Sequence, residues 1–128
     1  PIGANLDRVQ VVKGWLDAEG KSREKVFNVA WAGDRQPDTA GKLPTIGNTV
    51  NQATAAVSNS IGTDELSTLW VDPEFDASVR AFYYIRALQI PTARHSLYDA
   101  IALQVTETDR GAKTIQERAY SSPIWYTP

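Results

Sequence analysis

Residues 6–31 have the sequence LDRVQVVKGWLDAEGKSREKVFNVAW, which carries the first strong secondary-structure signal in the chain. Branched apolar residues alternate with polar ones over residues 6–16, which is typical of a half-buried strand. Residues 17–21 predict a turn, because Gly20 is free to adopt a positive φ. A second run of branched and aromatic residues follows over residues 25–31. We therefore expect an antiparallel hairpin.

Residues 81–90, AFYYIRALQI, are the next strong signal. Aromatic and branched residues crowd this segment, which favours a central strand with both faces largely covered. A helix from Pro73 onward is the alternative, because Phe75, Val79 and Phe82 also fall at helical spacing. We favour a turn over residues 72–76 followed by the strand.

The remaining segments carry weaker signals. Dense Gly and Pro residues predict a loop over residues 33–48. We expect further strands at residues 54–59, where a short helix is the alternative, and at residues 65–71. The last strand, residues 117–126, is interrupted by Pro123, which suits an edge position. Six short strands predict a mainly β fold, an antiparallel β-sandwich-like domain with one or two short helices, formed by residues 1–128 as a single domain.

Two segments complete the expected order of secondary-structure elements. Pro91 ends the strand at residues 81–90, and Ser96 or Asp99 is a candidate cap for a short helix that reaches Leu103. Residues 106–113 are polar and predict a turn.

Composition excludes several classes of function. The chain has 128 residues, 42% of them hydrophobic, and this is enough for one domain with a core. Its net charge of −2 argues against a nucleic-acid-binding surface. No run of about 18 apolar residues is present, so we expect no transmembrane segment. The absence of Cys excludes disulfides and thiolate metal sites.

The single histidine, His95, lies in a cluster of polar residues. One histidine cannot build a multi-histidine metal centre, so we assign no metal ligand. Arg94, His95, Ser96 and Asp99 together form a candidate ligand or inter-domain site, in which Arg94 offers a fork for a carboxylate or phosphate. Exposed loop residues and an ordinary ion pair are the simpler interpretation. No G-x-S-x-G motif supports a Ser-His-Asp triad, so we assign no catalytic residue.

Three carboxylates alternate at Asp72, Glu74 and Asp76, a spacing that oxygen ligands of Ca²⁺ also show. The glycine and the distal glutamate of a calcium loop are missing, so turn and capping roles are favoured. The four tryptophans, at positions 15, 31, 70 and 125, all fall in predicted strands. They suggest either sugar-stacking platforms or, as we favour, packing in the core and against another domain.

Several stretches of the chain resemble one bacterial family of proteins of unknown function, the family numbered 3604. They are residues 3–15, 72–76, 81–94, 96–100 and 114–128. The resemblance covers nearly the whole chain, and the part of the family that the chain resembles is the C-terminal region. The sequence departs from the family pattern at His95, where we expect Trp, and at Ala93, where we expect Pro.

The resemblance implies a role as part of a larger protein. Members of the family are several times longer and are usually exported, as periplasmic proteins or lipoproteins. Their N-terminal part resembles metal-dependent hydrolases of the polymerase-and-histidinol-phosphatase type, whose metal ligands have no counterpart here. We therefore expect a C-terminal accessory domain that packs on the N-terminal catalytic domain of the same chain. Such a domain holds no cofactor itself, and a divalent metal belongs to the larger protein.

Two other functions stay open from the sequence. One is a module that binds carbohydrates or small ligands through surface aromatic residues. The other is a self-contained hydrolase that uses His95, with Asp99 or Arg94 as helpers. The start at Pro1 and the absence of Met favour a piece of a longer protein, which agrees with the accessory role.

Overall fold

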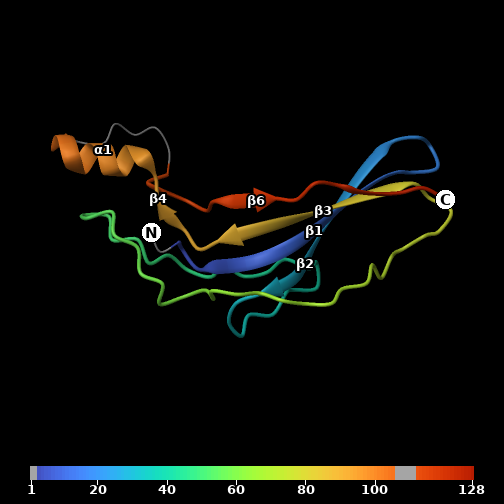
Figure 1. Cartoon of the computed structure of the whole chain (residues 1–128), viewed down its shortest axis with the longest axis horizontal. Coiled ribbons are helices and arrows are strands. Elements are labelled where there is room, and N and C mark those ends of the chain that lie inside the picture. The colour runs from blue at the N-terminus through green and yellow to red at the C-terminus, as the bar shows by residue number, and fades with distance from the viewer. Residues whose placement is uncertain (1–2, 106–111) are drawn as a thin grey trace.

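A computed structural model describes residues 3–105 and 112–128 of the chain (Figure 1). The fold is mainly β, with antiparallel sheets and one helix among the described residues, as predicted. In chain order the elements are β1 (Leu6–Leu16), β2 (Ser22–Trp31), β3 (Ala81–Gln89), β4 (Thr92–Ala93), α1 (His95–Leu103), β5 (Thr114–Ile115), β6 (Arg118–Tyr120) and β7 (Ile124–Tyr126).

The main sheet is built around β3. Its strand order is β2-β1-β3-β6, and β7 pairs with β3 on the same side as β6 (Figure 1). A second, two-stranded sheet joins β4 to β5. The predicted central strand is confirmed as Ala81–Gln89, and the alternative helix from Pro73 does not form. The faces of this strand are less covered than predicted, since Ile85 is 45% exposed.

The β1–β2 hairpin confirms the prediction from residues 6–31. Its turn is held by the Asp17 carboxylate, whose Oδ1 accepts hydrogen bonds from the N–H groups of Glu19 (3.1 Å) and Lys21 (2.8 Å). The bond from Lys21, with the nearby Arg23, holds the pKa of Asp17 below its usual value. Gly20 has φ +75°, as the turn requires.

The predicted strand at residues 54–59 is wrong. The side chains of Asn51 and Thr54 accept hydrogen bonds from the backbone N–H groups two residues further along, which form a turn. Polar side chains that bond to their own backbone compete in this way with regular structure. One isolated antiparallel pairing, between Val50 and Val57, is all the strand-like structure that this segment has.

The predicted strand at residues 65–71 is also wrong. Its apolar residues suggested burial in a sheet, but Leu69 is 95% exposed and Val71 is also exposed. Leu66 and Trp70 are half-buried, and the Trp70 ring centroid lies 5.1 Å from that of Phe27. The backbone here does not pair with the edge of the sheet, so its composition alone cannot make it a strand.

Residues 72–76 anchor one face of the main sheet. Lys13 on β1 is only 6% exposed, and its Nζ donates to the Asp72 carboxylate (2.6 Å) and to the Glu74 carbonyl (2.8 Å). The Tyr83 hydroxyl donates to the same Asp72 oxygen (2.8 Å). Glu74 pairs with Lys25 through its own carboxylate, and Asp76 binds Ser78. The three carboxylates thus serve three separate structural contacts, as the favoured interpretation predicted.

Tyr83 should lose its proton only at strongly alkaline pH. Burial and the adjacent Asp72 carboxylate raise its pKa to about 12, from an ordinary value of 10.0. Its contribution to stability is therefore complete below pH 10 and is lost as pH rises through 12. In an absorbance titration of tyrosinate, Tyr83→Phe should remove the last step while Tyr98→Phe keeps it. Persistence of that step in Tyr83→Phe would contradict the assignment.

The C-terminal third confirms one helix and an edge strand. α1 reaches Leu103 as predicted, but its N-cap is Arg94, so neither Ser96 nor Asp99 caps it. Pro123 lies between β6 and β7, which both pair with β3, in agreement with the interrupted edge strand. Of the predicted turn at residues 106–113, residues 106–111 lie outside the described part of the chain. Across that described part, no helix has the length and hydropathy needed to cross a membrane.

Candidate functional site

One face of the main sheet carries a set of large aromatic side chains. Phe82 lies opposite Gly14 of β1 and opposite Trp125 of β7, so these residues share a face. Gly14 has no side chain, and the Phe82 ring lies directly over it. A Cβ at Gly14 would be 2.3 Å from Phe82 Cζ, which is too close for any other residue unless the ring moves. The glycine therefore sets the position of the ring.

Four rings continue across this face as an aromatic row, which consists of Trp125, Phe82, Tyr84 and Tyr120. Successive ring centroids are 5.2, 6.4 and 6.1 Å apart, within the range of favourable aromatic contacts. The row runs from β7 through β3 to β6. Trp125 is 72% exposed and Tyr120 is 56% exposed, so both ends of the row face solvent.

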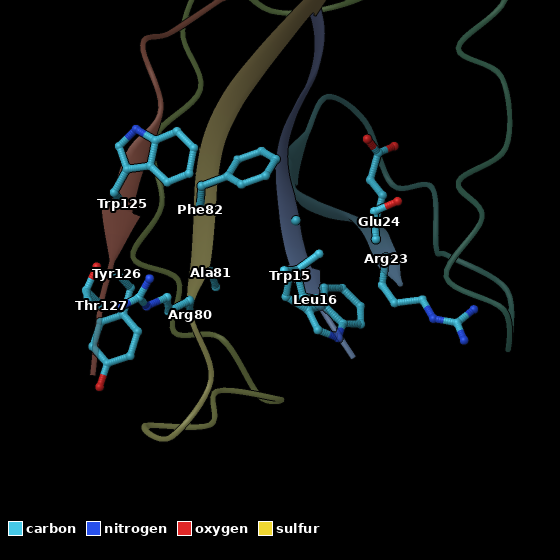
Figure 2. A pocket seen from close by; sticks show the side chains of 12 residues that line it. Trp15, Leu16, Arg23, Glu24, Arg80, Ala81, Phe82, Trp125, Tyr126 and Thr127 are labelled. Carbon is cyan, nitrogen blue, oxygen red and sulfur yellow. The ribbon is translucent and has the colours of Figure 1, made fainter. Parts of the chain in front are cut away.

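An open groove of about 580 Å³ lies beside Trp125 and Phe82, at the hairpin end of the sheet (Figure 2). Figure 2 shows the two rings next to each other on neighbouring strands, with Arg23 and Glu24 on the far side of the groove. Its walls come from residues 14–16, 22–24, 80–82 and 125–127. Arg23 already pairs with Asp17 (2.7 Å), which leaves the aromatic wall as the main binding surface of the groove.

A polar strip borders the row on the same face. Arg86 Nε donates to Gln10 Oε1 (2.8 Å), and Gln10 Nε2 donates to Asn28 Oδ1 (2.8 Å). Asn28 in turn donates to the carbonyl of Gly41 (2.9 Å), which fixes the loop beside the sheet. Because these polar groups hydrogen-bond to one another, the strip holds the loop against the sheet. The aromatic row is therefore the part of this face that a ligand or partner can contact.

The structure places the sequence-predicted site on α1. Arg94, His95, Ser96 and Asp99 are all exposed and lie on the first turns of the helix. They lie close together in sequence at the start of the helix, but none of them lines the aromatic groove, because α1 lies at the opposite end of the sheet (Figure 1). Their role as a ligand or inter-domain site stays a prediction. Within residues 3–105 and 112–128, no group of three or more His, Cys, Asp and Glu is placed to hold a metal ion.

Only part of the aromatic row could be predicted from the sequence. Trp125 is one of the four tryptophans that suggest stacking or interface packing, whereas the sequence predicts Phe82, Tyr84 and Tyr120 only as strand residues. The alternation of Phe82 and Tyr84 was the available signal, because residues two apart in a strand share a face. Trp15, Trp31 and Trp70 are half-buried, and Trp125 alone of the four tryptophans is exposed.

Comparison with known proteins identifies a family. The family model described as "Protein of unknown function (DUF3604)" matches residues 1–128. No curated protein and no solved structure matches the chain. The match covers the whole sequence, so the chain belongs to the DUF3604 family.

Proposed function

We propose that this chain is an accessory region that packs its aromatic row against a catalytic domain in a larger protein. The observation that carries the proposal is the exposed row itself, from Trp125 to Tyr120. Aromatic residues are enriched in protein interfaces, and contiguous exposed apolar surface marks places where another macromolecule binds. The same proposal places the protein outside the cytoplasm and puts a divalent metal in the catalytic domain, as the family resemblance implies.

Apolar exposure elsewhere on the molecule supports a large partner. Leu69 and Val71 are exposed to solvent on the segment before β3, and Leu103 is exposed at the end of α1. These residues lie in different parts of the fold from the aromatic row. A small ligand would need only one of these surfaces, whereas a neighbouring domain can cover several of them.

The buried core of the described residues is small, which favours the same conclusion. The large apolar side chains buried in this part are Val12, Leu43, Leu88, Ile90 and Leu97. Four of the nine buried apolar residues are alanines: Ala32, Ala55, Ala81 and Ala93. A chain with so little buried apolar surface gains stability when a partner covers its exposed faces.

Trp125→Ala should weaken association of this chain with the remainder of the longer protein when the two are expressed separately. We expect a loss of about 2 kcal/mol, about thirtyfold in Kd, because an interface tryptophan that becomes buried typically contributes that much. Isothermal titration calorimetry measures the change. Ile85→Ala is the control, since Ile85 is 45% exposed and lies next to Tyr84 on the opposite face of β3. Equal losses in both variants would contradict docking through the aromatic row.

A carbohydrate-binding role is the second candidate. The observation that favours it is Trp125, an exposed ring beside a groove with charged residues at its rim, as sugar-stacking sites require. Tryptophan fluorescence of the isolated chain, titrated with soluble glycans, decides between the two functions. A saturable change that Trp125→Ala abolishes supports glycan binding, and a flat titration excludes it for the glycans used.

A further inference from the structure

A second cavity, of about 340 Å³, lies away from the aromatic groove. It is formed where the start of β1 meets residues 45–48, Pro91 after β3 and Gln116 before β6. Asp7 and Arg8 contribute the charged groups, and Ile46 and Pro91 contribute apolar wall. Its size suits a small organic molecule.

The negative charge in this cavity is fully engaged. Asp7 is 1% exposed, and its Oδ1 accepts a hydrogen bond from Arg35 Nη2 at 2.6 Å. Its second oxygen accepts a hydrogen bond from Gln116 Nε2. Arg35 also donates to the carbonyls of Ala32 and Pro44, so its guanidinium is held in place. Asp7 and Arg35 thus form a closed, neutral pair.

Arg8 is paired only loosely. Its Nε is buried and has no hydrogen-bond acceptor among residues 3–105 and 112–128, and its Nη1 forms a long ion pair with Asp7 Oδ2 at 3.7 Å, beyond hydrogen-bond distance. A buried donor left without an acceptor is costly and therefore rare. Two guanidinium groups face one carboxylate here, which leaves one positive charge in surplus. The cavity consequently favours a ligand with a single negative charge and oxygen acceptors.

We propose that this cavity binds the carboxylate of a small organic acid. The two carboxylate oxygens accept hydrogen bonds from the two Nη groups of Arg8, whose side chain is 20% exposed, because its Nε is closed to the cavity. The carbon part of the acid lies against Ile46 and Pro91. A dianion such as phosphate fits less well, because Asp7 would repel its second charge. This site is independent of the proposed docking function.

The test uses propionate as the probe and inorganic phosphate at equal ionic strength as the comparison. We expect propionate to shift the Arg8 Nε–Hε resonance of the ¹⁵N-labelled chain in a saturable manner, with a smaller effect of phosphate. Arg8→Gln should weaken propionate binding by about tenfold or more, whereas Arg23→Gln, a change at an exposed arginine far from the cavity, should leave it unchanged.

The wild-type resonance decides the question even where Arg8→Gln fails to fold. A resonance that does not respond to propionate, or that responds more strongly to phosphate, overturns the proposal. Equal weakening of propionate binding in Arg8→Gln and Arg23→Gln also overturns it, because binding would then follow overall charge.

Discussion

Gly62→Ala is expected to destabilise the protein by about 3 kcal/mol. Gly62 has φ +79°, a conformation that costs an alanine about 1–2 kcal/mol. Its new Cβ would also lie 2.7 Å from Asn5 Cβ and Ile90 Cγ2, and 2.8 Å from the backbone oxygen of Leu6. Forced overpacking typically adds about 1–3 kcal/mol. The neighbouring Thr63 makes two backbone hydrogen bonds to Leu6, so the chain cannot easily move away.

Gly20→Ala is the matched control for this substitution. Gly20 has a similar φ of +75°, but a Cβ there would meet no atom within 4 Å. We expect only the conformational cost, about 1 kcal/mol. Urea denaturation followed by tryptophan fluorescence measures both variants. Equal losses in the two variants would show that the contact with Ile90 and Leu6 does not constrain the fold.

Asp72→Ala is expected to cost about 3 kcal/mol of stability. It removes the carboxylate that binds both Lys13 Nζ and the Tyr83 hydroxyl, and it leaves the Lys13 ammonium in a site that is almost closed to water. Removing one member of a buried ion pair typically costs about 3–5 kcal/mol, and the lower end suits a pair at the edge of a small core.

Glu74→Gln is the control for the ion pair. It breaks the contact of Glu74 with Lys25, in which both side chains are about half exposed. Exposed pairs contribute about 0–1 kcal/mol, so the expected loss is small. Chemical denaturation of the two variants provides the comparison. A loss in Glu74→Gln as large as that in Asp72→Ala would contradict the special role of the Lys13–Asp72 pair.

The same pair predicts how stability changes in acid. Burial disfavours the charged form of Asp72, but hydrogen bonds from Lys13, the Glu74 N–H and Tyr83 outweigh it, so the pKa of Asp72 is lowered below 3.8. Its stabilising contribution is therefore complete above the unfolded value and is lost as pH falls through the lowered folded value. Stability measured from pH 5 downward should fall less steeply in Asp72→Ala than in the wild type.

The sequence predicted those parts of the fold that depend on local pattern. The hairpin followed from alternation in residues 6–16, and β1 has these bounds. β2 begins at Ser22, three residues before the predicted start, because the turn at Asp17 is tight and pairing extends to its end. Residues 65–71 have similar apolar content but form no strand. A strand also needs a neighbouring strand with which to pair, and no local sequence pattern predicts whether one is present.

The aromatic row was harder to predict because it depends on register. Gly14, Phe82 and Trp125 are distant in sequence and meet only through the pairing of three strands. A shift of one residue would move Phe82 to the opposite face. The polar residues near His95 were chosen by residue type alone, and the structure places them on an exposed helical turn. Residue type identifies candidate chemistry, but strand pairing decides which side chains share a surface.

The long connection between β2 and β3 has a consequence for folding kinetics. The hairpin pairs residues close in sequence, from Leu16 with Ser22 onward, so it is expected to form early. β3 pairs with β1 only across long separations, as between Trp15 and Ala81, and such distant pairings form slowly. Until β3 pairs, the edge of β1 opposite β2 stays open to other strands. During this interval the chain is most prone to aggregate, and slow refolding at low concentration should give the best yield.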